Sequence, residues 1–494
     1  MTEKEFIDYI NQGYNLIPLS LSIKNSNIDP IDVYELLSDK PKTYLFESLE
    51  GNKDWSRYTI IGLPSDEYIE IHHNTINHYK NDDKINSLES NDPISWIEEF
   101  QAGFKAMQDP SLPNFQGGLV GFFGFDTIQY FEPTLNFKLQ DDLMKTPDIC
   151  MMVSREILIF DKINNLIHIL VYADNSIESY KSCSEKIEGL KEYLINFEST
   201  GSTNGPSTQD VDIKIHHHFE KKKFIKSIDK IKRYIVNGDA MQVVLSQRMS
   251  LDFQGKPISF YRELRELNPS PYMYYLNMGD YYIVGSSPEI LVRLEDGLIT
   301  VRPIAGTRPR GINDNQDSLF EDELLNDPKE RAEHLMLIDL GRNDAGKVSK
   351  IGSIKLTDTM IIEKYSHVMH MVSNVTGELS NNLGMIDVLK STFPAGTVSG
   401  APKIRAIEII YEQEDIKRGI YAGAVGYLGW NGNMDTAIAI RTSIIKNDKL
   451  YIQCGAGIVN DSIAELEWEE TMNKGKAIIQ AYKNLRKKMH DIND

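Results

Sequence analysis

The spacing of hydrophobic and polar positions predicts strands and helices in both halves of the chain. Apolar runs that end at turn residues indicate strands, whereas apolar positions that recur at helical spacing indicate helices. In the first half, strands are expected at residues 42–48, 57–62, 117–126, 153–160 and 166–173, and helices at 31–37, 92–107 and 176–197. A turn at 50–54 would join the first two strands, and the last two would form a hairpin. The glycines of 117–126 contain no G-x-G-x-x-G pattern, so they predict close backbone packing and not a nucleotide loop.

The second half alternates helical and strand-like patterns after a polar segment. Helices are expected at 222–237, 318–325, 326–349, 385–392, 403–414 and 465–489, and strands at 242–250, 272–278, 281–286, 290–294, 298–304, 422–430, 434–445 and 450–456. Residues 198–212 are dominated by Ser, Thr, Gly, Asn and Pro, which is typical of a linker. This linker would divide the chain into an N-terminal region, 1–197, and a C-terminal region, 213–494. The three histidines at 216–218 cannot all face one metal on a strand, so a loop or a strand entry is expected there.

Two helices each carry a pair of glutamates with helical spacing. Asp327 is a candidate N-cap and Pro328 would take the first helical position, so Glu330 and Glu333 would project from the same side. The pair Glu467 and Glu470 repeats this spacing near the C-terminus. Two such helices could enclose Mg²⁺, which prefers carboxylate oxygens and leaves room for a substrate anion. For either pair alone, a solvated face of an acidic protein is the more common explanation.

Composition and charge narrow the class of protein. The chain has 494 residues and a net charge of -19, with no basic stripe long enough to suggest a nucleic-acid surface. Its acidic N-terminus does not resemble a signal peptide, and no apolar run reaches membrane-spanning length. The three cysteines, Cys150, Cys183 and Cys454, are odd in number and widely spaced, which favours a reducing cytoplasm without disulfides or a zinc site.

Three glycine-containing loops are candidates for ligand binding. They are expected at 302–311, 393–403 and 454–459, where glycines allow a ligand to approach the backbone closely and N–H groups could bind an anion. Arg441 at a strand end could clamp a carboxylate, and His370 on a strand or turn, with His367 nearby, could act as a general acid. Each feature alone is more often an ordinary turn or surface residue. Together with the glutamate pairs they indicate a Mg²⁺-dependent enzyme that acts on a small polyanion.

Seven long motifs in one order make the sequence resemble a known family. They are PIAGTRPRG, DPKERAEHLMLIDLGRND, YSHVMHMVSNVTGEL, FPAGTVSGAPKIRAIEII, GIYAGAVGYLGWNG, MDTAIAIRT and CGAGIVNDS with EWEETMNK. The chain resembles the chorismate-utilising enzymes, and among them most closely component I of the anthranilate synthases. The resemblance covers residues 222–488 and reaches the N-terminal region through LFES and SRYTIIG. It implies an α+β fold of large antiparallel sheets with helices packed outside, and a chorismate-binding catalytic domain at 213–494.

The resemblance also implies roles for individual residues. The implied Mg²⁺ ligands are Glu333 and Glu470, with the carboxylates of Glu330 and Glu467 beside them. The implied substrate-binding residues are Tyr421, Arg441, Gly455, Ala456, Gly457, Ala305, Gly306 and Thr307. The implied catalytic residues are His370, assigned as the acid near the departing hydroxyl, Thr397 in the substrate loop, and Gln242.

Two positions separate the relatives within this family. Members that add water to chorismate carry a lysine base where this chain has Gln242, and an amide cannot take a proton from water. Aminodeoxychorismate synthases typically read PIKGT, whereas Ala305 replaces that lysine nucleophile here. Anthranilate synthesis from chorismate, the first step of tryptophan biosynthesis, is therefore the favoured reaction. An aminodeoxychorismate synthase with another nucleophile, and a non-catalytic interaction subunit on the same scaffold, remain alternatives.

A regulatory site and a partner are implied as well. The family's tryptophan feedback site resembles Glu47, Ser48, Pro269, Pro271, Tyr272 and Met273, which would give the N-terminal region a regulatory role. The usual family motif is LLES, so LFES departs from it slightly. The chain has no activated cysteine with a matching His–Glu pair, and thus no glutaminase. A separate glutamine amidotransferase subunit, component II, is expected to supply ammonia in a heteromeric complex.

Overall fold

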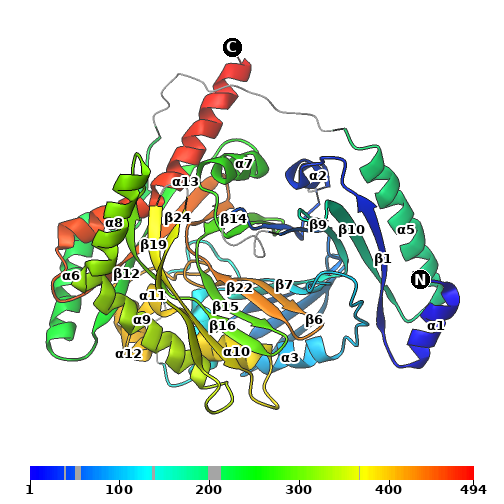
Figure 1. Ribbon diagram of the computed structural model, residues 1–494, viewed down its shortest axis with the longest axis horizontal. Helices are drawn as coiled ribbons and strands as arrows, with labels where there is room; N and C mark the ends of the chain where they lie inside the picture. The colour runs from blue at the N-terminus through cyan, green and yellow to red at the C-terminus, as the bar shows by residue number, and fades with distance from the viewer. Residues whose placement is uncertain (38–39, 51–56, 136–139, 199–212, 366–367, 494) are drawn as a thin grey trace.

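The computed structural model describes residues 1–494 except 38–39, 51–56, 136–139, 199–212, 366–367 and 494. The predicted linker, most of the turn at 50–54, and His367 therefore lie outside the described residues. The described residues form two large sheets with helices on their outer sides (Figure 1). Every strand pairing within these sheets is antiparallel, which confirms the predicted fold class.

The first sheet has twelve strands and combines segments from before and after the polar segment. Its order is β1 (Leu16–Lys24), β10 (Leu166–Asp174), β9 (Glu156–Asp161), β3 (Tyr58–Gly62), β2 (Thr43–Glu47), β13 (Tyr272–Asn277), β14 (Tyr281–Ser287), β23 (Thr442–Lys446), β24 (Lys449–Ile458), β12 (Gln242–Asp252) and β11 (His216–His217), with β20 (Gly400–Ala401) beside β12. The seam between the two regions is the pairing of β2 with β13. His216 and His217 thus enter a strand, as expected.

The second sheet also has twelve strands from both regions. Its order is β17 (Ile304–Pro309), β19 (Val368–Glu378), β16 (Leu298–Val301), β15 (Ile290–Glu295), β22 (Met434–Ile438), β21 (Ala424–Gly429), β7 (Gly118–Phe123), β8 (Ile149–Ser154), β4 (Glu67–His72), β5 (Thr75–Lys80) and β6 (Asp83–Glu89), with β18 (Lys355–Lys364) beside β19. Here the seam is the pairing of β21 with β7. The N-terminal and C-terminal regions are therefore joined through both sheets.

The two sheets share a hydrophobic layer. Side chains from each sheet, such as Tyr44 and Ile283 of the first and Val120 and Phe122 of the second, pack in one buried cluster. Successive residues of a strand point to opposite faces, so Leu45, next to Tyr44, belongs to the outer cluster of the first sheet. Burial on both faces explains why these strands read as continuous apolar runs.

Helices cover the outer face of each sheet. The first sheet carries α1 (Glu3–Asn11), α2 (Pro30–Leu37), α5 (Ile177–Ile195), α6 (Lys221–Val236), α7 (Pro257–Leu267), α12 (Lys403–Gln413) and α13 (Ala464–Asn493). The second carries α3 (Pro93–Ala102), the short turns η1 (Phe125–Thr127) and α4 (Ile128–Phe131), α8 (Asp314–Asn326), α9 (Pro328–Gly346) and α10 (Met385–Thr392). The short α11 (Gly396–Ser399) lies between α9 and the strands β12 and β24 of the first sheet. None of the helices within the described residues is long and apolar enough to cross a membrane.

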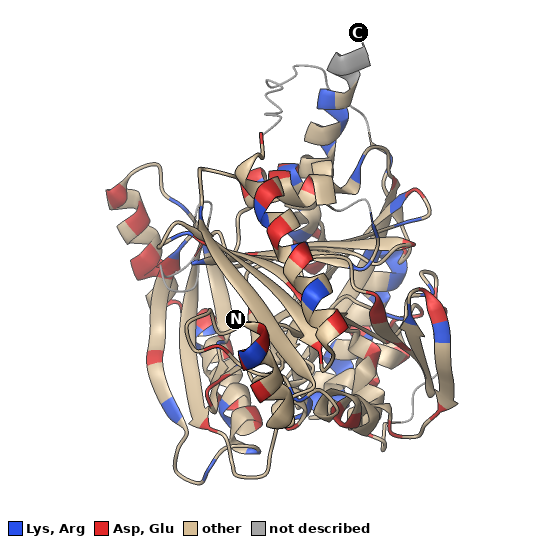
Figure 2. Ribbon diagram, turned by 90° about the vertical axis from the view of Figure 1, so that its right-hand side faces the viewer, with Lys and Arg blue, Asp and Glu red and all other residues tan. Residues whose placement is uncertain are grey.

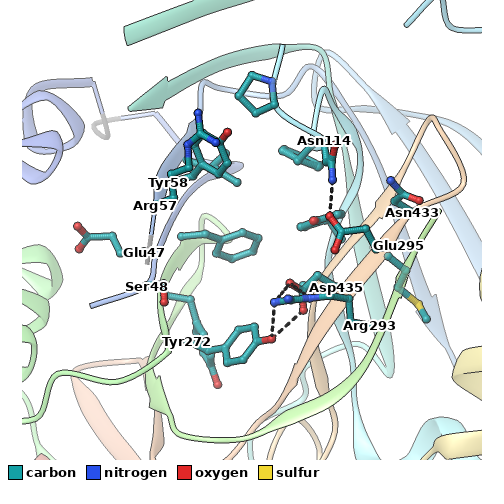
Figure 3. Close-up of a pocket in the computed structure, with 18 of the residues that line it drawn as sticks. Glu47, Ser48, Arg57, Tyr58, Asn114, Tyr272, Arg293, Glu295, Asn433 and Asp435 are labelled. Carbon is teal, nitrogen blue, oxygen red and sulfur yellow. Dashed lines mark hydrogen bonds and ion pairs between the residues drawn. The ribbon is translucent and has the colours of Figure 1, made fainter. Parts of the chain in front are cut away.

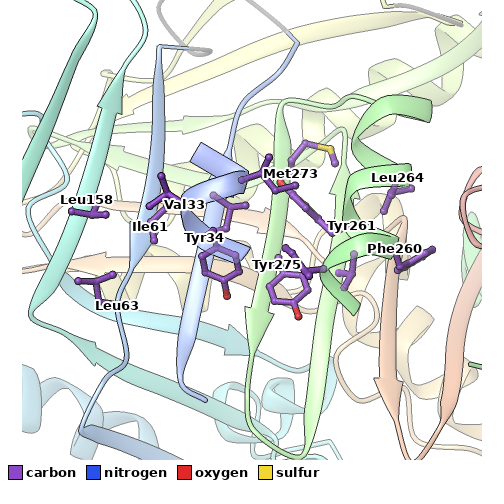
Figure 4. Close-up of a cluster of buried hydrophobic side chains, with 14 of the residues drawn as sticks. Val33, Tyr34, Ile61, Leu63, Leu158, Phe260, Tyr261, Leu264, Met273 and Tyr275 are labelled. Carbon is purple, nitrogen blue, oxygen red and sulfur yellow. The ribbon is translucent and has the colours of Figure 1, made fainter. Parts of the chain in front are cut away.

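Aromatic contacts fix α2 and α7 on the first sheet (Figure 4). Tyr34 of α2 and Tyr261 of α7 both contact Tyr275 of β13 edge to face, with ring centroids 5.4 Å and 5.9 Å apart. Such pairs add about 0.5–1.5 kcal/mol to the burial of the rings. Because α2 precedes and α7 follows the polar segment, this cluster ties the two regions together outside the sheets as well.

Three predicted strands differ from the structure, and all three errors occur where the chain changes direction. Residues 153–154 end β8 in the second sheet, so the hairpin begins only with β9. The predicted strand 298–304 is divided between β16 and β17, and the predicted strand 434–445 is divided between β22 and β23, which lie in different sheets. When an apolar run is buried on both faces, its sequence does not show at which residue the chain leaves one sheet for the other. Helices α1 and α7 were not predicted.

The glycine-rich strand β7 packs as expected. A Cβ at Gly121 would lie 1.9 Å from the carbonyl oxygen of Cys150, and one at Gly118 would lie 2.1 Å from that of Leu428. Only glycine fits such contacts, so these residues serve backbone packing. Figure 2 shows the charged residues mainly on helices and loops, while the long strands between them contain few. Cys150, Cys183 and Cys454 are free thiols.

Candidate functional site

One cavity of about 560 Å³ gathers almost all of the predicted site residues. We call it the acidic cavity. Its lining includes Gln242, Glu289, Ala305, Gly306, Thr307, Glu330, Glu333, His370, Thr397, Tyr421, Arg441, Gly455, Gly457, Glu467, Glu470 and Lys474. These residues come from β12, β17, β19, β24, α9, α11 and α13, from the segment between α12 and β21 that contains Tyr421, and from two further segments that connect the sheets. A volume of this size is typical of a small-molecule site.

The connecting segments bring two charged residues to the cavity. The chain passes from β14 in the first sheet to β15 in the second through Glu289, and returns from β22 to β23 through Arg441. The two crossings lie side by side, because the Ile438 N–H donates to the Glu289 carbonyl and the Ser286 N–H donates to the Arg441 carbonyl. Arg441 has a φ of 51°, so it occupies the turn itself and does not end a strand as predicted.

The first glutamate pair is placed by the start of α9. Asp327 caps this helix by accepting hydrogen bonds from the N–H groups of Lys329 and Glu330, and Pro328 takes the first position, as predicted. Glu330 and Glu333 then face the cavity from successive turns, and Glu333 accepts a hydrogen bond of 3.0 Å from the Gln242 amide. Glu467 and Glu470 reach the same cavity from the first turns of α13.

The four glutamates supply the oxygen ligands that a divalent cation prefers, but their carboxylates do not converge on one position in the structure. Burial and the neighbouring glutamate raise the pKa of Glu330, and the same two causes raise the pKa of Glu467, so each pair carries unrelieved repulsion. A hard cation would relieve this repulsion. However, Glu330 pairs with Arg308 at 3.3 Å and Glu470 with Lys474 at 2.7 Å. In the part of the chain that the structure describes, no three His, Cys, Asp or Glu side chains come close enough to hold a metal ion.

Two glycines of β24 make room for side chains that reach the cavity. A Cβ at Gly455 would lie 2.8 Å from the Tyr421 hydroxyl, and one at Gly457 would lie 2.4 Å from the Gln242 amide nitrogen. Residues 454–458 are thus part of a strand and not the predicted loop. Because side chains alternate along a strand, Ala456 points the other way, into the core beneath α6 and α12, and does not line the cavity.

The strand β17 contains most of the first predicted glycine loop, 302–311. Residues 304–309 pair with β19 and contain a bulge between Ala305 and Thr307, so most of the segment 302–311 is strand rather than loop. The bulge aims the Gly306 carbonyl at His370, whose Nδ1 lies 3.0 Å from that oxygen. A carbonyl only accepts, so Nδ1 carries the proton and Nε2 is left for the cavity. Burial lowers the pKa of His370, which favours this neutral ring.

Two further residues of the cavity were not singled out from the sequence. Lys474 donates to the Gly455 carbonyl at 2.9 Å and pairs with Glu470, so it places a cation between the β24 backbone and α13. Glu289 is buried, and this burial raises the pKa of its carboxyl to about 8. A carboxyl with such a pKa holds its proton at neutral pH. The motif Ser-Ser-Pro-Glu between two strand-like runs was the available sequence signal, because Pro288 interrupts the pattern there.

A second pocket of about 530 Å³ lies between the two sheets (Figure 3). We call it the inter-sheet pocket. Tyr272 of the first sheet donates to Asp435 of the second at 3.0 Å, and Arg293 binds the same carboxylate. Of the residues predicted for a tryptophan site, Ser48, Pro271, Tyr272 and Met273 line this pocket, whereas Pro269 does not. Glu47 lies at the wall, but its carboxylate accepts hydrogen bonds from Tyr261 and Arg265 of α7 and is fully buried.

Comparison with known proteins identifies the family. The model of the chorismate binding enzymes matches residues 48–480, which includes every element of the acidic cavity. The chain belongs to the chorismate binding enzyme family. The resemblance drawn from the seven motifs is thereby confirmed.

Relatives within the chorismate binding enzyme family are similar over almost the whole chain. Anthranilate synthase component 1 of Pseudomonas aeruginosa is 49% identical over 97% of this chain and 98% of that protein. The component 1 of Aquifex aeolicus is 44% identical over 97% of each. The crystal structure of anthranilate synthase component I from Streptococcus pneumoniae superposes with a TM-score of 0.77 at 38% identity, covering 92% of this chain and 98% of that one.

More distant members of the chorismate binding enzyme family share the fold. The isochorismate synthase MenF of Escherichia coli superposes with a TM-score of 0.70 at 16% identity, covering 97% of this chain and 99% of that one. At this identity only the architecture is shared.

Proposed function

We propose that this protein is the large subunit of an anthranilate synthase, which converts chorismate and ammonia to anthranilate and pyruvate. The observation that carries the proposal is the lining of the acidic cavity. There, carboxylate pairs and cations meet beside Gln242 and Ala305, at the two positions where relatives with other reactions carry a lysine. Neither residue can act as a general base toward water or as an amine nucleophile, so ammonia is the reagent that this cavity favours.

The cavity offers a charged contact for each carboxylate of chorismate. Arg441, Lys474 and the Tyr421 hydroxyl line the cavity and would bind the enolpyruvyl carboxylate. Glu333 and Glu470, with Glu330 and Glu467 beside them, line the same cavity and would hold Mg²⁺. When bound, the ion would neutralise the ring carboxylate and relieve the repulsion within each glutamate pair.

Loss of the ring hydroxyl requires a proton donor, and the cavity contains two candidates. His370 was assigned this role from the sequence, but its lowered pKa favours the neutral ring. Glu289 keeps a proton up to about pH 8, the value of its pKa, and lies in the same lining. We therefore assign the role of proton donor to Glu289. His370 would orient the Gly306–Thr307 segment through the hydrogen bonds of its Nδ1. Ammonia would then add to the ring, and elimination would release pyruvate.

A separate glutamine amidotransferase subunit would supply the ammonia. The sequence provides no cysteine with a matching His–Glu pair for hydrolysing glutamine, and the three thiols are buried or half-buried. Burial raises the pKa of Cys150, Cys183 and Cys454, which is the opposite of what a nucleophilic thiol needs.

The test is an assay without the partner. The purified chain is incubated with chorismate, Mg²⁺ and ammonium chloride, and anthranilate is followed by its fluorescence and pyruvate by a coupled reaction. Equal amounts of both products are expected, with no turnover when glutamine replaces ammonium. Formation of aminodeoxychorismate without pyruvate would assign the alternative synthase, and no consumption of chorismate would favour a non-catalytic scaffold.

Tryptophan is proposed as the ligand of the inter-sheet pocket. The pocket combines aromatic walls, Tyr58 and Tyr272, with polar groups from both sheets, such as Arg57 and Asn114, which suits an aromatic amino acid (Figure 3). Its strands β15 and β22 also run to the acidic cavity, so a ligand there could change the reaction rate.

Filling the pocket should abolish inhibition without loss of activity. Ser48 lines the pocket and does not line the acidic cavity, so Ser48→Phe places a ring where tryptophan would bind. We expect the inhibition constant for tryptophan to rise by at least about tenfold, the equivalent of one lost aromatic contact, with kcat changed little. The matched control is Ser87→Phe on the exposed face of β6. Inhibition that is unchanged in Ser48→Phe would place the effector elsewhere.

A further inference from the structure

Arg418 is buried beside the acidic cavity and is held by an ion pair. It lies between α12 and β21, and it is first by volume among the fully buried side chains of the described residues. Its Nε and Nη2 donate to the two carboxylate oxygens of Glu414 at 2.8 Å and 2.6 Å. This bidentate geometry fixes the plane of the guanidinium group.

The remaining donors of Arg418 reach two walls of the cavity. Nη1 donates to the Val398 carbonyl of α11 and Nη2 donates to the Val244 carbonyl of β12, each at 2.8 Å. The guanidinium carbon also lies 5.6 Å from the ring centroid of Tyr421. Val244, Val398 and Tyr421 all line the acidic cavity. One side chain therefore connects three walls that are distant in the sequence.

Glu414 extends the same network to a second point on β12. Its Oε1 accepts hydrogen bonds from the Ser246 N–H at 2.8 Å and from the Ser246 hydroxyl at 2.9 Å. Each charge is thus compensated in a site without water access. A buried ion pair is costly to desolvate, and a well-packed apolar pair often gives equal or greater stability. A contribution to stability therefore does not explain why the ion pair is present. The positions of the residues that it holds explain it better.

We propose that Arg418 and Glu414 are positioning residues for the reaction in the acidic cavity. The pair fixes Val398, which follows Thr397, and the β12 segment that begins at Gln242, and it supports the ring of Tyr421. The proposal rests on the proposed function, because it concerns the walls of the same cavity. Small displacements of such walls are costly, since a misplacement of about 1 Å can reduce a rate by roughly 10²-fold.

The test compares two arginines in similar ion pairs. Arg418→Lys keeps the charge but loses the fork that spans Glu414, Val244 and Val398. Arg262→Lys is the control: Arg262 also binds a carboxylate with Nε and Nη2, joins α7 to Glu35 of α2, and does not line the cavity. We expect kcat for chorismate to fall by roughly 10- to 100-fold in Arg418→Lys and by less than about threefold in Arg262→Lys. The KM of Arg418→Lys should change less than kcat, because Arg441 and the glutamates remain.

A double variant separates positioning from stability. Arg418→Met with Glu414→Leu replaces the pair by apolar side chains of similar size, and it should unfold at a higher temperature than Arg418→Met alone. Its kcat should stay as low as that of the single variant, because no group then holds Val244 and Val398. A kcat that recovers in step with the melting temperature, or an unchanged kcat in Arg418→Lys, would overturn the proposal.

The measurements are made on chorismate consumption at a temperature where all variants are folded. This readout does not depend on which product forms. If wild type consumes chorismate but yields another product, the proposed function fails and the comparison of variants still tests the positioning role. If wild type consumes none, the comparison is made on the shift in melting temperature that chorismate produces, which Arg418→Lys should reduce and Arg262→Lys should keep.

Discussion

Replacing Glu333 by glutamine should reduce anthranilate formation by at least about 10³-fold, because it removes a charge that the proposed Mg²⁺ site requires. Glu333 faces the acidic cavity from α9 and accepts a hydrogen bond from Gln242. Glutamine has the same shape and can accept that bond, so the fold and the melting temperature should not change. The measurement is the ammonium-driven assay over a range of Mg²⁺ concentrations.

The control lies on the other glutamate helix. Glu469 is exposed on α13 and does not line the cavity, so Glu469→Gln should keep wild-type turnover. A second readout does not depend on activity: Mn²⁺ binding, followed by electron paramagnetic resonance, should weaken in Glu333→Gln and not in Glu469→Gln. Normal Mn²⁺ binding and turnover in Glu333→Gln would show that these carboxylates do not hold the metal.

Local chemistry made one part of this site predictable from the sequence. The Asp327 cap, the Pro328 start and the spacing of Glu330 and Glu333 all depend on residues within one or two helical turns. The same holds for the second glutamate pair on α13. That the two helices could enclose one cation was a hypothesis from the paired spacing, and the family resemblance supported it; their placement at one cavity depends on the tertiary fold.

Tertiary placement explains what the sequence could not provide. Arg441 appeared to end a strand because nothing in a continuous apolar run shows that β22 and β23 belong to different sheets. Glu289 went unnoticed for the same reason, since its burial arises from the crossing between β14 and β15. The family resemblance implied that Ala456 binds the substrate, whereas strand alternation directs its side chain into the core. Helix α7 could have been predicted from the sequence, because Pro257 stands at its first turn and an amphipathic pattern follows.

Replacing Glu289 by glutamine should lower kcat/KM by roughly 10²- to 10⁴-fold, the usual contribution of a general acid. We expect this loss because the variant lacks the acidic proton. Burial raises the pKa of Glu289 from 4.5 to about 8, so its carboxyl can donate a proton at neutral pH, whereas the amide of the glutamine cannot. In wild type, kcat/KM should fall as the pH rises through about 8, where Glu289 loses its proton. The lowered pKa of His370 places its ionisation below 6.5, well separated from this limb. Glu289→Gln should lose the alkaline limb, which a pH series of initial rates would reveal.

The same pKa makes a prediction about stability that does not depend on the reaction. A carboxyl whose pKa rises from 4.5 to about 8 on folding binds its proton more tightly in the folded state. It therefore stabilises the fold fully below pH 4.5, and this stabilisation is lost as the pH rises through about 8. Lys474, the cation that acts on Glu289, offsets only part of the burial. Wild type should thus lose melting temperature between pH 6 and 9 more steeply than Glu289→Gln, by about 1 kcal/mol or more in unfolding free energy, since each pKa unit corresponds to about 1.4 kcal/mol.

The control for both measurements is Glu98→Gln on α3. Burial also raises the pKa of Glu98, but this residue lies outside the acidic cavity, so its replacement should leave the pH profile of kcat/KM unchanged. If Glu289→Gln kept both the activity and the alkaline limb, the proton would have to come from His370, as the sequence first suggested. If the stability difference also disappeared, Glu289 would be ionised in the folded protein, and the crossing between the two sheets would hold a charge instead of a proton.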